Sequence, residues 1–235
     1  MLNPEISPAR IERNETMELS PGPPGPPGPP ASSRPLYEIS KRWFDLIVSA
    51  GLLILLSPLL LLLALAVKLT STGPVFYRWQ VVGLGGRPFT GYKFRTMVVN
   101  ADALKAQLLA ANEMSGPVFK MKHDPRITPI GRILRKLSLD ELPQLWSVLI
   151  GDMSLVGPRP PLRSEYVQFE EWQRAKLSVK PGLTCLWQIS GRNRVSDFDE
   201  WVRLDLDYIA RRSFWFDLWI LLRTVPAVLL GHGAS

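Results

Sequence analysis

The sequence predicts an α+β protein that is held at a membrane by an N-terminal helical hairpin and continues into a mostly helical domain. Three observations lead to this fold class. A run of 22 residues without a charge, Leu46 to Val67, is interrupted at its centre by Ser57 and Pro58. Aromatic or branched residues alternate with polar ones around Gly83 to Gly86, which indicates a β-hairpin. Several later segments repeat apolar residues at helical spacing.

Residues 1–40 are expected to form a disordered tail. They are polar and rich in proline, and Pro21 to Pro30 reads PGPPGPPGPP. Three such triplets are too few for a collagen triple helix, so we interpret them as a polyproline II spacer. Binding of a proline-recognising partner is the alternative. No secretory signal is expected, because the first apolar run comes after this tail.

Residues 41–70 are predicted to enter the membrane. The apolar run is long enough to cross about 30 Å of hydrocarbon as a helix, but its central proline removes one backbone hydrogen bond and bends the helix. Lys41 and Arg42 precede the run, and Lys68 and Arg78 follow it. Because both flanks are basic, the positive-inside rule gives no orientation. This symmetry favours a re-entrant segment that leaves by the face it entered; a kinked transmembrane helix is the alternative.

The basic charge of the chain is concentrated in its middle. The net charge is +7, and Lys68 to Glu141 contains 12 basic and 5 acidic residues, whereas the two flanks cancel. A block of this kind predicts anionic partners, which are phosphates, nucleic acid or an acidic membrane surface; ordinary solvated charges are the alternative. The single cysteine, Cys185, excludes an internal disulfide and fits a reducing compartment. His123 is expected to be a polar loop residue, and no zinc site is expected.

Residues 71–235 are predicted to form one domain. Its first element is the hairpin within Pro74 to Met97, whose glycines do not have the spacing of a nucleotide-binding fingerprint. Ala101 to Met114 consists of strong helix formers and predicts a helix. Thr128 and Pro129 have the pattern of an N-cap and a first helical residue, and predict a helix that runs through Lys136.

Two adjacent carboxylates, Asp140 and Glu141, begin the next predicted helix. The apolar residues from Leu142 to Ile150 have helical spacing, Pro143 suits a first turn, and Gly151 suits the end. Free N–H groups and the macrodipole favour negative charge at a helix N-terminus, so the position tolerates both carboxylates. A purely capping role for the pair is the alternative.

A group of basic residues is expected to surround this pair. Arg135 and Lys136 are close enough in sequence to keep both carboxylates ionised, and Arg159 and Arg192 lie in loops rich in proline and glycine. Such loops lose little entropy when they hold a side chain against a ligand. Three arginines and two carboxylates predict a site for a diphosphate bridged by a divalent cation.

With these motifs the sequence resembles the bacterial sugar transferases, a family of small monotopic polyprenyl-phosphate phosphoglycosyl transferases that prime exopolysaccharide, O-antigen or glycoprotein synthesis. The resemblance covers about Lys41 to Gly231 and depends on several long motifs in the right order. They are KRWFD, the apolar segment with its Ser57-Pro58 break, GPVFYRWQVVG, YKFRTM, DPRITPIGRILRKLSLDELPQLWSVLIGDMSLVGPRP and KPGLTCLWQISGRN.

The resemblance implies a two-step transfer with Mg²⁺ as cofactor. By matching position, Asp140 is the expected nucleophile, which attacks the β-phosphate of a UDP-sugar and releases UMP. Polyprenyl phosphate then attacks the phosphosugar-aspartate and forms a polyprenyl-diphosphate-sugar. Glu141 is expected to assist through the metal or the incoming phosphate, and both carboxylates are the expected metal-binding residues. A carboxylate nucleophile divides one difficult transfer into two easier steps.

The resemblance also assigns the basic residues. Arg135, Arg159 and Arg192 match family arginines that bind phosphate or substrate, and Lys93 and Arg95 of YKFRTM are expected to bind phosphate with them. Mg²⁺ and these cations would offset the charge of the transferring group. Ser57 and Pro58 match the break of the family's re-entrant helix, which implies a location at the bacterial inner membrane with the catalytic domain on the cytoplasmic face.

The acceptor is a lipid phosphate, so Asp140 is expected at the level of the lipid headgroups. Ser213 to Leu222, which reads SFWFDLWILL, predicts an interfacial helix that supports this position, and an aromatic core helix is the alternative. One departure from the family is Cys185, where members often have glycine. We expect activity to survive, with a slightly different loop geometry.

Two other functions compete with the transferase. A membrane-anchored nucleic-acid binder would use the basic block, but the sequence has no stacking aromatics interleaved with a basic stripe, so no nucleic-acid partner is expected. An inactive scaffold for a polysaccharide assembly complex is the other, and the intact Asp140-Glu141 pair argues against it. The identity of the transferred sugar stays open among glucose, galactose and acetamido sugars, with a simple hexose preferred. Whether the protein forms a homo-oligomer also stays open.

Overall fold

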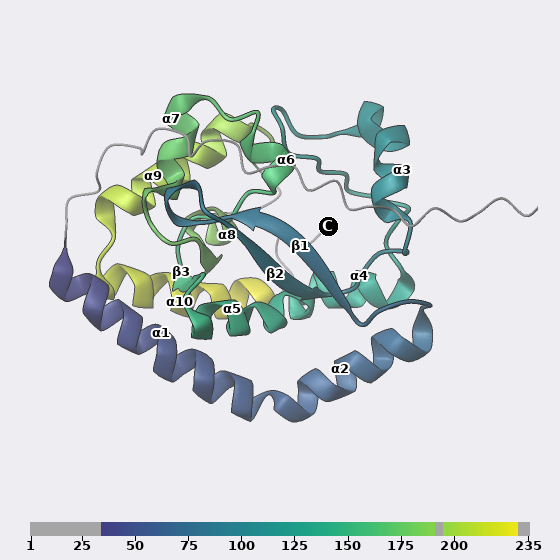
Figure 1. The fold of residues 1–235 in the computed structure, drawn as a ribbon, viewed down its shortest axis with the longest axis horizontal. Coiled ribbons are helices and arrows are strands. Elements are labelled where there is room, and N and C mark those ends of the chain that lie inside the picture. Colours follow the sequence, from purple (N-terminus) through teal and green to yellow (C-terminus); the bar gives the residue numbers. More distant parts are fainter. Residues whose placement is uncertain (1–33, 191–194, 230–235) are drawn as a thin grey trace, which may run out of the picture.

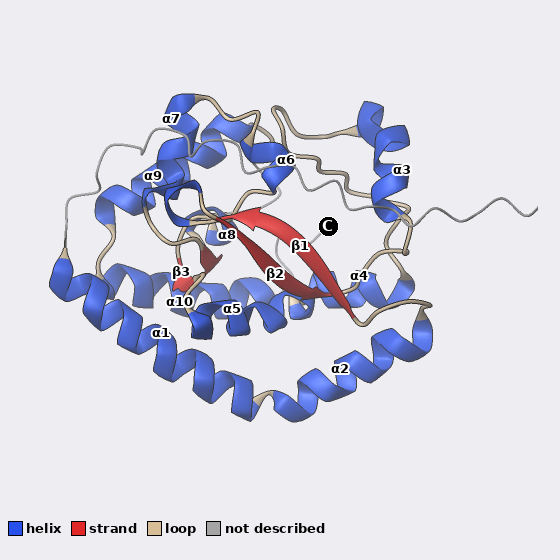
Figure 2. Ribbon diagram, viewed as in Figure 1, coloured by secondary structure: helices blue, strands red, loops and turns tan. Residues whose placement is uncertain are grey.

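The structure, a computed structural model, describes residues 34–190 and 195–229. Two long helices form a shallow V along one side of the molecule, and the remaining helices surround a central antiparallel hairpin (Figure 1). Helices predominate and the strands are few (Figure 2). This confirms the α+β class and the mostly helical domain with a small sheet.

Helices and short strands succeed one another along the described residues. In chain order they are α1 (Pro35–Leu55), α2 (Ser57–Thr70), β1 (Phe76–Val82), η1 (Leu84–Gly86), β2 (Pro88–Phe94), α3 (Ala101–Leu108), η2 (Leu109–Ala111), α4 (Pro129–Lys136), η3 (Leu139–Gln144), α5 (Leu145–Ile150), β3 (Ser154–Val156), α6 (Arg163–Tyr166), α7 (Glu171–Arg174), η4 (Ala175–Ser178), β4 (Gly182–Thr184), α8 (Leu186–Ile189), α9 (Phe198–Arg211) and α10 (Phe214–Leu229), where η denotes a 3₁₀ helix.

The two arms of the V are α1 and α2, and the chain bends by 61° between them. The break is at Leu56, directly before Ser57 and Pro58, and Ser57 Oγ donates a hydrogen bond to Ile54 O (2.8 Å). Neither helix alone has the length and hydropathy of a membrane span, but the bent pair together does. Helix α1 begins at Pro35, earlier than the boundary at residue 41 that the sequence suggested.

The KRWFD residues attach α1 to the domain. Arg42 donates to the carbonyls of Val148 (2.7 Å) and Leu149 (2.8 Å), near the end of α5. Lys41 Nζ lies 2.6 Å from Asp217 Oδ2 of α10, and Asp45 accepts a hydrogen bond from the backbone N–H of Leu155 in β3. Carbonyls at a helix end and a buried N–H need hydrogen-bond partners, so these contacts fix the position of α1 on the domain.

The hairpin β1–β2 is antiparallel, as predicted, with Trp79 opposite Gly91. A Cβ atom at Gly91 would lie 2.2 Å from Nε1 of Trp79, so only glycine leaves room for the indole ring at this position. Residues Leu84–Gly86 close the hairpin, with Gly85 and Gly86 at positive φ. The short strands β3 and β4 form a separate parallel pair.

Of two predicted helices, one is found with the predicted ends and the other is shorter than predicted. Helix α4 runs from Pro129 to Lys136 with Thr128 as its N-cap, as predicted; Thr128 Oγ1 accepts from Gly131 N (3.0 Å). Helix α3 ends at Leu108 and η2 at Ala111, so the prediction of a helix through Met114 is wrong. The helical segment ends at Asn112, because the side chain of Asn112 accepts a hydrogen bond from Lys120 N and donates one to Met114 O. These bonds stabilise a loop in place of further helical turns.

Helix α10, which contains the predicted interfacial segment, has two faces. Asp217 and Ile220 are buried against the domain, whereas Trp215, Trp219 and Leu222 are exposed. One face therefore belongs to the core, as the alternative interpretation proposed, and the other carries the exposed aromatic residues that the prediction required. His123 is an exposed loop residue, as expected.

Candidate active site

The carboxylate pair lies in the first turn of η3, directly after a sharp reversal of the chain. Ser138 has φ of 51°, a left-handed conformation that is uncommon for residues other than glycine, and its N–H donates to Arg135 O (3.0 Å). Asp140 and Glu141 are each 7% exposed. They do begin a helical segment, but its first turns are 3₁₀ and contain Pro143, and the α-helix begins only at Leu145.

Two basic side chains, one from strand β2 and one from a loop, contact Glu141. Lys93 Nζ lies 2.6 Å and Arg159 Nη1 3.1 Å from the same oxygen, Oε1. Lys93 comes from β2 and lies over the ring of Trp79, 4.1 Å from its centroid, where a cation is attracted to the ring face. The site therefore brings together residues 93, 141 and 159, as the sequence predicted.

Burial and the charge of Glu141 have opposite effects on the pKa values of Lys93 and Arg159. Burial lowers the pKa of Lys93, although the nearby carboxylate of Glu141 acts against it. Burial also acts to lower the pKa of Arg159, but the negative groups around it, Glu141 foremost, together outweigh burial, so the pKa of Arg159 is raised above its usual value. The ion pair between Arg159 and Glu141 therefore holds both side chains in place at one side of the site.

Arg135, in the last turn of α4, is the third predicted cation of the site. Burial lowers the pKa of its guanidinium, and the charge of Asp140 is the largest effect in the opposite direction. Lys136, the next residue, is exposed and lines neither cavity of the site. The expectation that both basic residues flank the carboxylates therefore holds for Arg135 alone, because successive helical residues point in different directions.

A cavity of about 240 Å³, which we call the polar cavity, opens beside the pair. It is rich in charge, and its charged lining residues are Lys93, Lys120, Asp124, Arg126, Arg135, Asp140, Glu141 and Arg159. Five cations and three carboxylates make an environment that suits a diphosphate.

Asp124 and Arg126 are buried residues of this cavity to which the sequence assigned no function. Arg126 donates to both oxygens of Asp124, with Nη2 2.6 Å from Oδ2, and also to the carbonyl of Ala101. Burial acts to raise the pKa of Asp124, but the hydrogen bonds from Arg126 outweigh it, so this pKa is lowered. The DPR triplet was visible in the sequence, but nothing local showed that it faces the carboxylate pair.

A second cavity of about 340 Å³, which we call the aromatic cavity, reaches the same carboxylate from another side. It shares Lys93, Arg135, Asp140 and Arg159 with the polar cavity. Most of its other lining residues are apolar, although Arg95, Asp102, Glu165 and Lys176 also line it. Its aromatic residues are Phe76, Tyr77, Trp79, Phe94, Phe119, Phe169, Phe198 and Trp201, and of these Phe119 and Trp201 also line the polar cavity. Asp140 therefore lies where a charged and an apolar cavity meet.

The remaining predicted residues lie elsewhere. Arg95 lines the aromatic cavity, but its guanidinium donates to the carbonyls of Ser71 and Pro74 and to Ser71 Oγ. These contacts favour a positioning function for Arg95 at the end of α2, and binding of phosphate stays a prediction. Ser57 and Pro58 lie at the bend of the V. Arg192 lies outside the described residues.

The donor set can be compared with the needs of Mg²⁺. Within residues 34–190 and 195–229, no three His, Cys, Asp or Glu side chains are clustered as a complete metal site. Mg²⁺ is usually held by one or two carboxylates together with substrate phosphates and water, and not by a cage of protein ligands. Asp140 and Glu141 fit this mode of binding, because both line the polar cavity.

Comparison with known proteins places this geometry in context. The family described as bacterial sugar transferase matches residues 36–231. The galactosyl transferase CpsE of Streptococcus agalactiae is 53% identical over 163 residues, which are 69% of this chain and 36% of that protein. The undecaprenyl-phosphate galactose phosphotransferase of Salmonella typhimurium is 46% identical over 198 residues, 83% of this chain and 41% of that protein.

A third relative is matched over more of its own length. The UDP-glucose:undecaprenyl-phosphate glucose-1-phosphate transferase of Caulobacter vibrioides is 42% identical over 211 residues, which are 86% of this chain and 74% of that protein. The chain thus spans less than half of the first two relatives and about three quarters of the third.

Proposed function

This chain belongs to the bacterial sugar transferase family, and on that basis we propose that it transfers a sugar 1-phosphate from a UDP-sugar to undecaprenyl phosphate and releases UMP. The observation that carries the proposal is the position of Asp140, which lines both cavities together with Arg135. The neighbouring Glu141 forms ion pairs with Lys93 and Arg159. The names of the Salmonella and Caulobacter relatives support the same donor and acceptor classes.

In the first step, an oxygen of the Asp140 carboxylate attacks the β-phosphorus of the UDP-sugar. The bond from this phosphorus to the bridging oxygen breaks, and UMP leaves with that oxygen. The product is an acyl phosphate, in which the phosphosugar is joined to the carboxylate of Asp140. Carboxylates of this kind form covalent intermediates in other phosphoryl-transfer enzymes.

In the second step, an oxygen of the lipid phosphate attacks the same phosphorus. The bond to the Asp140 oxygen breaks, the carboxylate is regenerated, and a polyprenyl-diphosphate-sugar leaves. The two steps together exchange UMP for polyprenyl phosphate on one phosphorus atom, so no other reactant is consumed.

The basic residues stabilise the charge that both steps place on the transferring phosphoryl group. Lys93 and Arg159 hold Glu141 in place, and Arg135 lines both cavities, from which it can contact the phosphoryl oxygens. Preorganised cations in a site with little water stabilise such charge strongly. When bound, Mg²⁺ would be held by Asp140 and Glu141 together with diphosphate oxygens, and would offset negative charge there.

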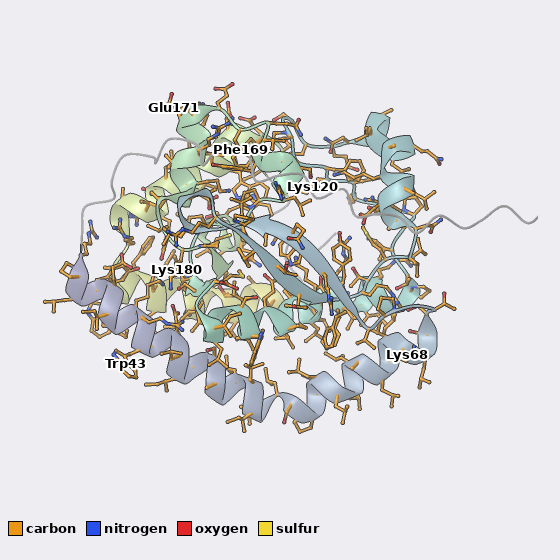
Figure 3. All side chains as sticks on the ribbon, viewed as in Figure 1. Trp43, Lys68, Lys120, Phe169, Glu171 and Lys180 are labelled. Atoms are coloured by element: carbon orange, nitrogen blue, oxygen red, sulfur yellow. The ribbon has the colours of Figure 1, made fainter. Side chains whose placement is uncertain are left out.

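The V of α1 and α2 is proposed to be a re-entrant membrane anchor that places the domain on the cytoplasmic face of the inner membrane. Its outer surface is apolar: Ile47, Leu61 and Leu69 are 69%, 73% and 75% exposed. Trp43 lies on the side of α1 that faces away from the domain (Figure 3). Exposed apolar residues on this scale indicate a membrane or a partner surface, and tryptophan is enriched at the membrane interface.

The proposal is tested by turnover of the purified full chain in detergent. A panel of UDP-sugars is offered with undecaprenyl phosphate and Mg²⁺, and UMP and lipid-linked sugar are measured. We expect one hexose donor to give both products in equal amounts, with no lipid product when the acceptor is omitted. Absence of UMP with every UDP-sugar would overturn the proposal.

A further inference from the structure

We propose that the aromatic cavity binds the phosphate-proximal isoprene units of the lipid acceptor, while the polar cavity binds the diphosphate of the donor. This inference rests on the proposed function and adds to it a separate place for each substrate. The two cavities share Asp140, so that both substrates reach the same nucleophile from different sides.

The two cavities differ in the share of charged residues that line them, and the two substrates differ in the same way. The polar cavity has five cationic lining residues, which match a diphosphate. Most residues that line the aromatic cavity are apolar, including rings such as Phe76, Tyr77 and Trp79. Its charged lining residues are the four shared with the polar cavity and Arg95, Asp102, Glu165 and Lys176. A phosphate joined to a hydrocarbon chain has this same division, with charge at one end and an apolar body beyond it.

The exposed residues that line the aromatic cavity, which we call its mouth, are mostly apolar, and Asp102 is the charged residue among them. Phe76 is 46%, Tyr77 42% and Val99 66% exposed, although all three line the cavity. Phe76 stacks on Phe94 with ring centroids 5.4 Å apart, so the exposed ring continues an aromatic wall that leads inward. Apolar side chains clustered at the edge of a cavity indicate that an apolar ligand passes there.

This mouth lies next to the end of the proposed membrane anchor. The chain from Ser71 to Val75 connects α2 directly to β1, and β1 starts beside the C-terminal end of α2 (Figure 1). Arg95 fixes this connection through Ser71 and Pro74. Val99 lies against it as well, because a Cβ atom at Gly73 would be 2.8 Å from a methyl group of Val99.

The position of the mouth suits an acceptor whose chain stays in the membrane. A lipid tail that leaves the bilayer beside Leu69, which is 75% exposed on α2, would lie close to the exposed apolar side chains at this mouth. Its phosphate would then reach the cations around Asp140. The uridine ring is the other ligand that aromatic walls could bind, and measuring donor and acceptor binding separately distinguishes the two.

The test uses Val99→Asp in the full chain, with Val167→Asp as the matched control. Val167 has the same residue type and nearly the same exposure, 67%, and lines neither cavity. Two quantities are measured for each protein. One is the burst of UMP from UDP-sugar without acceptor, and the other is the KM for undecaprenyl phosphate in steady-state turnover in detergent micelles.

We expect Val99→Asp to raise the KM for undecaprenyl phosphate about tenfold and to leave the UMP burst unchanged, because a carboxylate in the mouth opposes an apolar chain but not a diphosphate. A water-soluble short-chain isoprenyl phosphate should show the same increase, which separates the cavity from membrane attachment. Phe76→Ser should act in the same direction, whereas Val167→Asp should match the wild type.

Two results would overturn the inference. An unchanged KM for both acceptors in Val99→Asp and Phe76→Ser would show that the chain does not use this mouth. A slower burst or a higher KM for the UDP-sugar, with acceptor binding unchanged, would assign the aromatic cavity to the nucleoside. Either result leaves the proposed function intact, because the wild-type burst tests that function separately.

Discussion

Nζ of Lys93 lies 2.6 Å from Oε1 of Glu141, and this contact joins the central hairpin to the carboxylate pair. It is supported on one side by the face of Trp79 and on the other by Arg159, which reaches the same oxygen. The hairpin therefore sets the orientation of Glu141, and the site depends on residues separated by 48 positions in the chain.

Removing the cation of Lys93 is expected to reduce activity strongly. In Lys93→Met, Glu141 loses one of the two cations that fix Oε1, and the rate of UMP release should fall about 100-fold, as for loss of one preorganised donor in other enzymes. Arg87→Met is the matched control, since Arg87 is an exposed cation of the same hairpin. Equal rates for the two variants would show that the Lys93–Glu141 contact has no catalytic importance.

Arg135 and Lys136 are neighbours with opposite environments, and they make a second pair of variants. Arg135 lines both cavities, whereas Lys136 is exposed. We expect Arg135→Met to reduce kcat/KM for the UDP-sugar about 100-fold and Lys136→Met to change it less than about twofold. The comparison needs only steady-state rates, and a similar loss in both variants would contradict the assignment.

The ion pair of Asp124 and Arg126 predicts a pH-dependent contribution to stability. The pKa of Asp124 is lowered in the folded state, so the stabilisation is complete above the unfolded-state pKa and is lost as the pH falls through the folded-state pKa. Asp124→Asn leaves Arg126 buried without its partner carboxylate and should reduce the free energy of unfolding by about 3 kcal/mol at pH 7.

Denaturant unfolding at several pH values measures this contribution. The difference between wild type and Asp124→Asn should be constant above about pH 5 and should shrink below about pH 4. A difference that stays the same down to about pH 3 would mean that the carboxylate of Asp124 does not stabilise the fold through its charge.

A labelling experiment tests the re-entrant anchor. Leu36 is 84% exposed at the start of α1, and Thr72 is exposed just after α2. Leu36→Cys and Thr72→Cys should both react with a membrane-impermeant maleimide from the cytoplasmic side only. The wild type controls for Cys185, which is buried and should not react. Reaction of the two positions from opposite sides would show that the pair crosses the membrane.

Local rules account for the parts of the fold that were predicted correctly. The hairpin follows from alternation around Gly85 and Gly86, and α4 from a threonine cap and a proline in the first turn. The break of the V follows from Ser57 and Pro58. Each of these signals is contained in a few consecutive residues, so no tertiary contact was needed to recognise it.

The features that were not predicted depend on contacts and backbone conformations that helix propensity and sequence motifs do not contain. The end of α3 depends on Asn112, whose partner Lys120 lies eight residues further on, so helix propensity alone predicted a helix that is too long. Arg95 belongs to the same motif as Lys93, yet its guanidinium donates to the carbonyls of Ser71 and Pro74, a contact that the motif does not reveal, and its binding of phosphate stays a prediction. The 3₁₀ form of η3 depends on the reversal at Ser138, which sequence patterns do not reveal.

The covalent phosphosugar-aspartate is the central claim, and intact-protein mass spectrometry tests it most directly. The full chain is incubated with its UDP-sugar and Mg²⁺ in the absence of acceptor, and the adduct is located by peptide mapping. We predict that wild type gains the mass of one phosphosugar on Asp140, that Asp140→Asn gains none, and that Glu141→Gln forms the adduct more slowly. Turnover to lipid product without any adduct on wild type, or an adduct of equal yield on Asp140→Asn, would contradict the account.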